Sequence, residues 1–172
     1  MPIVNALDDD STVGQDRLLN ALGAFALVNQ ACVVADIGTA VTVDFVDGHG
    51  VFQGGVIAPG PRLMLSSLHQ RTAALPALDL AAPDPARGVF GKDTHHAMQL
   101  GVQRAVRGLV HECLERYSEA YGAYPRIIAT GGDAQNVLAG DELIEQFVPD
   151  LQLIGVAAAC RTIEELDAPG NA

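Results

Sequence analysis

Apolar residues recur at helical spacing in two stretches of the chain. Between Asp16 and Asn29 they fall every three or four residues, which gives a helix one apolar face. A longer helix is predicted over Thr94–Tyr121, because Gly122 and Pro125 follow it as stop signals. Further elements are predicted between these two helices and after the second one.

Three short strands joined by tight turns are predicted between the two helices. Cys32–Asp36 is a β-branched run that ends at a turn, and Val41–Val46 alternates in part between apolar and polar residues. Val51–Ile57 follows Asp47–Gly50, which is a strong hairpin turn. The pair Gly54-Gly55 indicates a bulge or a close backbone approach in the third strand.

Helix and strand then alternate along the second half of the chain. The expected elements are a helix opened by Pro59-Gly60-Pro61 and running to about His69, an ordered loop over Leu75–Gly91, the helix Thr94–Tyr121, a strand over Arg126–Ala129, a helix with Asp133 as its N-cap, a strand over Leu151–Ile154 and a helix over Val156–Leu166. The tail 167–172 is expected to fray. This order predicts one mixed α/β sheet covered by helices, in the βββαβαβα order of a single ribonuclease-H-like module.

Composition excludes several classes of protein. The chain has 172 residues, of which 49% are hydrophobic and 18% charged, as in one globular domain. Ten Lys and Arg residues stand against 21 Asp and Glu residues, so the formal net charge is −11. A field of that sign repels phosphate backbones and anionic lipid, so neither nucleic acid nor a membrane surface is expected as a partner.

The cysteines and histidines form no disulfide or zinc pattern. Cys32, Cys113 and Cys160 are an odd, scattered set, which indicates buried thiols in a reducing cytoplasm. The histidines lack zinc-like spacing to the cysteines, and the adjacent His95 and His96 are expected to be solvated helix residues.

Candidate chemistry is found at the end of the first predicted strand, in Asp36-Ile37-Gly38-Thr39-Ala40. The glycine lets backbone N–H groups approach a phosphate, and the Thr39 hydroxyl adds a donor. The Asp36 carboxylate can hold a cation that bridges to the phosphates. A plain hairpin turn that uses Asp and Gly as turn residues explains the spacing equally well.

Three other motifs lie where helices begin. In Gly14-Gln15-Asp16-Arg17 the acid can orient a hydroxyl and the arginine can hold a carboxylate, although an acid also stabilises a helix start by roughly 0.3–1 kcal/mol. Gly131-Gly132-Asp133 is either a phosphate or nucleotide site or an ordinary strand-to-helix turn. Thr94, in Gly91-Lys92-Asp93-Thr94, is either an N-cap or also a donor to a ligand.

Taken together and in this order, the motifs resemble those of type III pantothenate kinases. The matching stretches are Val13–Arg17, Asp36–Asp44, Gly54–Gly60, Thr72–Pro76, Gly91–Thr94 and Thr130–Ala134. They extend over nearly all of the chain, and six motifs in the correct order are hard to obtain by chance.

The resemblance implies the actin-like fold of the sugar-kinase and ATPase superfamily, in which two ribonuclease-H-like halves enclose ATP. It implies ATP-dependent phosphorylation of pantothenate to 4'-phosphopantothenate, the first step of coenzyme A synthesis. The implied cofactors are Mg²⁺ with ATP and a monovalent cation, K⁺ or NH₄⁺. The implied assembly is a homodimer in the cytoplasm.

The resemblance also implies roles for individual residues. By motif match, Asp16 corresponds to the catalytic base, and a carboxylate ionised at pH 7 can orient the alcohol and take its proton. Arg17 can grip the pantothenate carboxylate by a bidentate pair. The implied contacts are Gly14, Gln15, Asp16, Arg17 and Thr94 for pantothenate, Gly38, Thr39, Gly131 and Gly132 for ATP, and Asp36 for the monovalent cation.

The chain departs from the family pattern in two places. The family usually has a Tyr and a Pro shortly before the Gly-x-Asp-Arg motif, where this chain has Leu7 and Asp10, so one pantothenate contact is not expected here. The Asp-x-Gly-Asn phosphate loop of the family's N-terminal half occurs nowhere in this sequence. We therefore expect the C-terminal half of such a kinase: a fragment, a half completed by a partner, or a protein that is not a working kinase.

Two other functions remain open from the sequence. The missing phosphate loop and Leu7 are consistent with a non-catalytic binding or regulatory protein derived from a kinase. The predicted strand order and the strand-end carboxylates of Asp36 and Asp133 are consistent with a ribonuclease-H-like nuclease that uses Mg²⁺. The charge of −11 argues against the nuclease.

Overall fold

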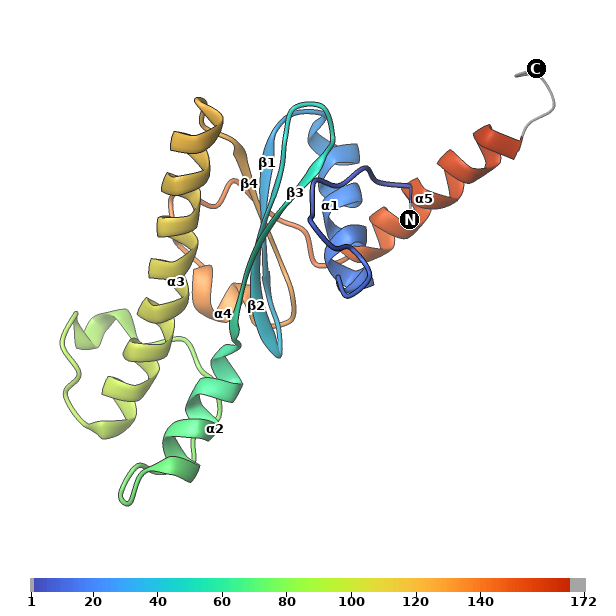
Figure 1. The fold of residues 1–172 in the computed structure, drawn as a ribbon. Coiled ribbons are helices and arrows are strands. Elements are labelled where there is room, and N and C mark those ends of the chain that lie inside the picture. Colours follow the sequence, from blue (N-terminus) through green and yellow to red (C-terminus); the bar gives the residue numbers. More distant parts are fainter. Residues whose placement is uncertain (1, 168–172) are drawn as a thin grey trace.

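A central five-stranded sheet with helices on both faces makes up the fold in the computed structural model, which describes residues 2–167 (Figure 1). The elements are α1 (Gln15–Val28), β1 (Cys32–Ile37), β2 (Ala40–Val46), β3 (Phe52–Pro59), α2 (Pro61–Arg71), the short 3-10 helix η1 (Pro85–Arg87), α3 (Thr94–Tyr121), β4 (Arg126–Thr130), α4 (Ala134–Leu138), β5 (Gln146–Phe147) and α5 (Leu151–Asp167). The predicted loop over 75–91 is irregular apart from η1. Asp167 is helical, and the rest of the predicted frayed tail, 168–172, lies outside the described residues.

The strand order is β3-β2-β1-β4-β5. The first three strands form an antiparallel meander, while β4 pairs parallel with β1 and β5 parallel with β4. The mixed α/β sheet and the meander at its start were therefore predicted correctly. The register of β3 against β2 shifts beside Gly54, where the sequence predicts a bulge.

Alternation along β1 divides its side chains between two cores. Val33 and Ala35 pack under α3 and α4, whereas Cys32 and Val34 pack with α1 on the opposite face. Both layers are visible in Figure 1, with α3 and α4 on one side of the sheet and α1 and α5 on the other. Because β1 has neighbours on both edges and both faces, it is the most deeply buried part of the fold.

The predicted strand over Leu151–Ile154 is wrong, because these residues form the first turn of α5. Leu151 is fully buried in the core beneath α1, and Leu153 is exposed. A short apolar run has the same appearance in a buried strand and in the first turn of a packed helix. The fifth strand lies at Gln146–Phe147 instead and is too short to show a period.

Helices α1 and α5 cross in direct backbone contact. A Cβ added to Gly23 would lie 2.6 Å from the carbonyl oxygen of Leu151, and one added to Gly155 would collide with the carbonyl of Leu19. The two glycines therefore let the helices approach more closely than any side chain would allow. This contact fixes α1, which carries the first candidate motif.

Two smaller predictions also need correction. His96 is buried, at 3% exposure, whereas only its neighbour His95 is exposed. Cys160 is exposed, while the predicted burial of Cys32 and Cys113 is confirmed.

Among the described residues, no helix combines the length and the apolar character needed to cross a membrane.

Candidate functional site

The predicted motifs meet at one end of the sheet. Asp36, near the carboxyl end of β1, pairs in register with Thr42 on β2 and Thr130 on β4. Helices α1, α2 and α4 begin at this same end (Figure 1). Open α/β sheets bind their ligands at the carboxyl ends of parallel strands, so this end is the candidate site.

On the α1 side, Arg17 is bonded to Asp44. Its Nε lies 3.1 and 3.2 Å from the two carboxylate oxygens, and its Nη2 bonds to Oδ1 as well. The Asp44 side chain is 3% exposed and that of Arg17 14%, and the guanidinium carbon lies 5.6 Å from the centre of the Phe52 ring. Burial raises the pKa of Asp44, and the hydrogen bond from Arg17 opposes that rise.

This ion pair limits what Arg17 can do for a ligand. The Nε–Nη2 edge of its guanidinium is occupied by Asp44. The edge formed by Nη1 and the second Nη2 hydrogen is the one left to bind a carboxylate. Binding of the pantothenate carboxylate by Arg17 therefore stays a prediction, and it concerns only this outer edge of the guanidinium.

Asp16, the predicted base, lies in the first turn of α1 and is exposed. Its carboxylate folds against Gly14, so that a Cβ at position 14 would collide with Asp16 Oδ1. A side chain at position 14 would therefore require the Asp16 carboxylate to move, while the Gly14 φ of −62° is ordinary for any residue. Leu7, at the place of the family's usual tyrosine, is half-buried and packs against the core on this face.

Asp36 is held by a residue that the sequence reasoning missed. The Asn20 side chain donates from Nδ2 to Asp36 Oδ2 at 2.8 Å, and Asn20 is 4% exposed. Its other amide atom, Oδ1, is buried and bonds to no described residue. Burial raises the pKa of Asp36, which the Asn20 hydrogen bond partly offsets and the charge of Asp16 reinforces.

The glycine turn after β4 closes over the same carboxylate. Gly131 has a φ of +94°, and a Cβ there would collide with Asp36 Oδ1 and the Ile37 backbone. Asp133 N donates to the Ile37 carbonyl at 3.0 Å. The two strand-end motifs are therefore in direct contact, and only glycine fits at position 131.

On the other face of this end, Asp133 is bonded to Arg62. The Arg62 Nε lies 3.1 and 3.0 Å from the two Asp133 oxygens, and Nη2 lies 2.9 Å from Oδ1. Asp133 is the N-cap residue of α4, as predicted, but its side chain makes no cap bond to the helix. The arginine takes the carboxylate instead.

A cavity of about 550 Å³ lies beside this second ion pair. It is lined by Gly38, Thr39, Arg62, Leu63, Ser66, Gly132 and Asp133. Three of the four residues predicted to contact ATP are therefore brought together here, and Gly131 adjoins them through Asp36. Arg62 was missed because it belongs to no glycine motif and lies 71 residues from its partner.

Thr94 lies elsewhere. It is the first residue of α3, and the N-cap is Asp93, whose side chain accepts from the backbone N–H of His96 at 2.8 Å. Thr94 lines an apolar groove of about 780 Å³ between α2 and α3, with Met64 and Met98 among the other lining residues. Neither this groove nor the cavity beside Arg62 is lined by a residue of the Gly14–Arg17 loop.

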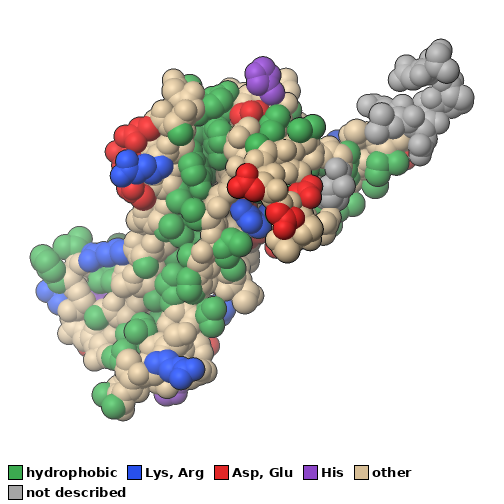
Figure 2. Space-filling model, in the orientation of Figure 1, with side chains coloured by type: hydrophobic (Ala, Val, Ile, Leu, Met, Phe, Trp, Pro, Cys, Tyr) green, Lys and Arg blue, Asp and Glu red, His purple; other side chains and the backbone are tan. Residues whose placement is uncertain are grey.

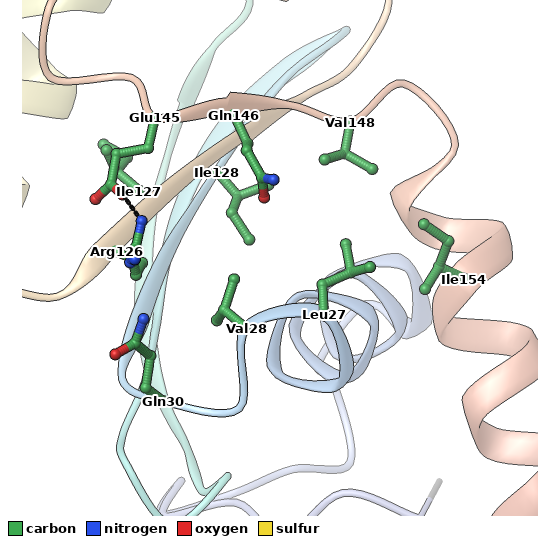
Figure 3. A pocket seen from close by; sticks show the side chains of 10 residues that line it. All are labelled: Leu27, Val28, Gln30, Arg126, Ile127, Ile128, Glu145, Gln146, Val148 and Ile154. Atoms are coloured by element: carbon green, nitrogen blue, oxygen red, sulfur yellow. Dashed lines mark hydrogen bonds and ion pairs between the residues drawn. The ribbon is translucent and has the colours of Figure 1, made fainter.

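Another cavity, of about 700 Å³, lies at the opposite end of the sheet (Figure 3). It is bounded by the end of α1, by β4 and β5 and by α5, and the ion pair of Arg126 with Glu145 lies at its rim. None of the predicted site residues lines it.

Figure 2 shows acidic and basic side chains in small separate groups, with no broad basic surface on the face drawn.

Known proteins similar to the chain agree with the motifs. The family model described as type III pantothenate kinase matches residues 1–116. A type III pantothenate kinase of Akkermansia muciniphila is 45% identical over 147 residues, which are 86% of this chain and 60% of that protein. The kinase of Roseobacter denitrificans is 36% identical over 167 residues, 97% of this chain and 64% of that protein. The chain thus spans about 60% of the length of these relatives.

A crystal structure with the same fold comes from Campylobacter jejuni. It is described as a conserved Baf family transcriptional activator and is 18% identical, with a TM-score of 0.62 over 95% of this chain and 70% of that one. This likeness bears on the fold alone, and the mixed α/β class of that fold was predicted. The family model covers more than half of the chain, and it agrees with the motifs assembled at the end of the sheet. The chain therefore belongs to the type III pantothenate kinase family, as its motifs predicted.

Proposed function

We propose that this chain is the pantothenate-binding part of a kinase that transfers the γ-phosphoryl group of ATP to the primary alcohol of pantothenate. The product is 4'-phosphopantothenate, the first intermediate of coenzyme A synthesis. The observation that carries the proposal is the meeting of three motifs, Gly14–Arg17, Asp36–Thr39 and Gly131–Asp133, at the carboxyl ends of β1 and β4.

Asp16 is proposed as the base. The pantothenate hydroxyl donates to its carboxylate, the alcohol oxygen attacks the γ-phosphorus, the bond to the ADP oxygen breaks, and the alcohol proton passes to Asp16. Two other carboxylates lie near enough to interact with its charge, those of Asp36 and Asp44. The Arg17 pair neutralises Asp44, which keeps negative charge from accumulating where ATP must approach.

The surroundings of Asp36 suit a monovalent cation. Asp36 and the unpartnered Oδ1 of Asn20 are oxygen donors from two elements, and the described residues contain no group of three His, Cys, Asp or Glu side chains that would mark a transition-metal site. A bound K⁺ or NH₄⁺ would supply positive charge beside the ATP phosphates. Mg²⁺ would arrive with the ATP.

We also propose a homodimer in the cytoplasm. Thr94 begins α3, on the other side of the sheet from α1 (Figure 1), and this supports the dimer, because a second copy can bring its Thr94 to the Gly14–Arg17 loop. Free thiols at Cys32, Cys113 and Cys160 are consistent with a reducing compartment. Sedimentation equilibrium would test the dimer, and a monomer at all concentrations would contradict it.

The activity is tested by pantothenate-dependent release of ADP from ATP, with Mg²⁺ and K⁺. The assay is run on this chain alone and on the chain mixed with the part of the Akkermansia relative that it does not match. Asp16→Asn should lower turnover by about 100-fold or more while pantothenate still binds. Asp8→Asn, another exposed acid with no bonded partner among the described residues, is the control. Absence of turnover in both arrangements would contradict the proposal, and pantothenate binding without turnover would favour a non-catalytic binding protein.

A further inference from the structure

The cavity that gathers Gly38, Thr39 and Gly132 is bordered by one pair of opposite charges. Arg62 is the cation among its lining residues and Asp133 is the anion. Every other lining residue is a glycine, a hydroxyl side chain or a leucine. An anion that enters this cavity can therefore contact one positively charged side chain of the lining, the Arg62 guanidinium.

Asp133 fixes the direction of that guanidinium. It occupies the Nε–Nη2 edge of Arg62 and is itself 8% exposed, so the anchored edge faces the protein. Within residues 2–167, Nη1 has no acceptor, and the Arg62 side chain is 59% exposed. The outer edge of the fork thus stays available, with two N–H groups in the geometry that matches two oxygens of a phosphate.

The charge of the whole chain gives such a group a purpose. With a formal net charge of −11, the protein repels a polyphosphate at long range. Backbone N–H groups of a glycine turn offer dipoles but no net charge. A phosphate chain that lies against Gly38 and Gly132 is therefore stabilised by a cation at the same place, and Arg62 lies there.

From this arrangement we propose that Arg62 is a further residue of the nucleotide site, where its outer edge binds a phosphate group of ATP and Asp133 acts as its positioning residue. The inference deepens the proposed kinase function and depends on ATP entering this cavity. It assigns to Arg62 a charged contact with phosphate, which the glycine motifs do not provide.

The experiment measures dissociation constants of ATP, adenosine and inorganic tripolyphosphate by calorimetry for the whole chain and its variants. Arg62→Ala should weaken ATP and tripolyphosphate by about tenfold, the effect of losing one hydrogen bond to a charged group, and should leave adenosine unchanged. Arg62→Lys keeps the charge but loses the fork, so it should give a smaller loss.

Arg71→Ala is the matched control. Arg71 is an exposed arginine on the same helix, its removal changes the net charge equally, and it lines the apolar groove rather than this cavity. Its ATP affinity should stay within about twofold of the parent, because exposed charges at a distance are screened by salt. The melting temperature of each variant confirms that it is folded.

Each outcome separates the two proposals. ATP binding that is equal in the parent and in Arg62→Ala overturns the role of Arg62 and leaves the kinase proposal intact. An equal loss for adenosine means that Arg62 contacts the nucleoside, which overturns the phosphate contact. Tripolyphosphate binding that depends on Arg62, without ATP binding, supports Arg62 and contradicts the ATP site. Binding of none of the three ligands overturns the role of Arg62, and the kinase proposal is then decided by the turnover assay with the added part of the Akkermansia relative.

Discussion

Two bidentate Arg–Asp pairs lie on opposite faces of the same end of the sheet, and they differ in their access to water. In the first, Arg17 is 14% exposed and Asp44 3%, and Phe52 lies beneath the guanidinium. In the second, the arginine is 59% exposed and its acid 8%. The hydrogen bonding is nearly the same in both pairs, through Nε and Nη2.

Exposure to water determines whether each ion pair contributes to stability or to ligand binding. When one partner of a buried pair is lost, the remaining charge stays in a medium that solvates it poorly. The Arg62 pair should lose less stability, because Asp133, although 8% exposed, lines a cavity that water can enter when the arginine is removed. The Arg17–Asp44 pair is therefore part of the scaffold that holds α1 on the sheet, and the Arg62 pair presents a charged group to a ligand.

The largest effect is expected from breaking the buried pair. Arg17→Ala leaves the Asp44 carboxylate buried without its cation, and it should lower the free energy of unfolding by about 3 kcal/mol. Arg62→Ala removes the same chemical group and should have a smaller effect, because water in the cavity can solvate the Asp133 carboxylate. Urea unfolding of both variants measures the difference. Equal losses would show that exposure of the arginine does not distinguish the two pairs.

The sequence predicts the scaffold of this site better than its ion pairs. The helix over 94–121 and the three-strand meander follow from local periodicity and from turns such as Asp47–Gly50, and they are confirmed. Asp44 has the appearance of an ordinary polar position in an alternating strand, yet it is buried. Its burial depends on Arg17, which lies 27 residues away, and no local pattern encodes that contact.

The missed residues have the same physical origin. Arg62 meets Asp133 across 71 residues, and Asn20 meets Asp36 across 16. Asn20 did leave a trace in the sequence, because it is a polar residue on the apolar face of an otherwise regular amphipathic helix, four residues after Asp16. Such a residue is buried when the helix packs and then requires a polar partner.

The second effect concerns the helix that carries Arg17. Gly155→Ala puts a methyl group into the carbonyl of Leu19 at the α1–α5 crossing and should cost about 1–3 kcal/mol of stability by overpacking. Gly108→Ala is the control, since it replaces a glycine inside α3 where a Cβ meets nothing within 4 Å. The control should stabilise the protein by about 0.5–1 kcal/mol, because alanine is the better helix former. Thermal unfolding of both variants tests the contrast, and stabilisation by both would disprove the close crossing.

The smallest effect concerns Asp36, which lies between the two pairs and has no arginine of its own. Burial raises the pKa of Asp36 in the folded protein above its usual value, so the folded state binds a proton more readily than the unfolded state. Between the usual and the raised pKa, stability therefore falls as pH rises, and at neutral pH the ionised Asp36 is a net cost.

Asp36→Asn removes that charge and keeps an acceptor for Asn20. The variant should be slightly more stable than the parent at pH 7, and the difference should shrink as the pH falls through the raised pKa toward the usual value of an aspartate. Thermal unfolding between pH 3 and pH 8 measures it, with Asp8→Asn as the exposed control. A parent that is more stable than Asp36→Asn at pH 7, in buffer free of K⁺ and NH₄⁺, would mean that Asn20 stabilises the ionised carboxylate more than burial opposes it. The ionised Asp36 carboxylate would then stabilise the folded protein, as the buried Arg17–Asp44 pair is expected to do.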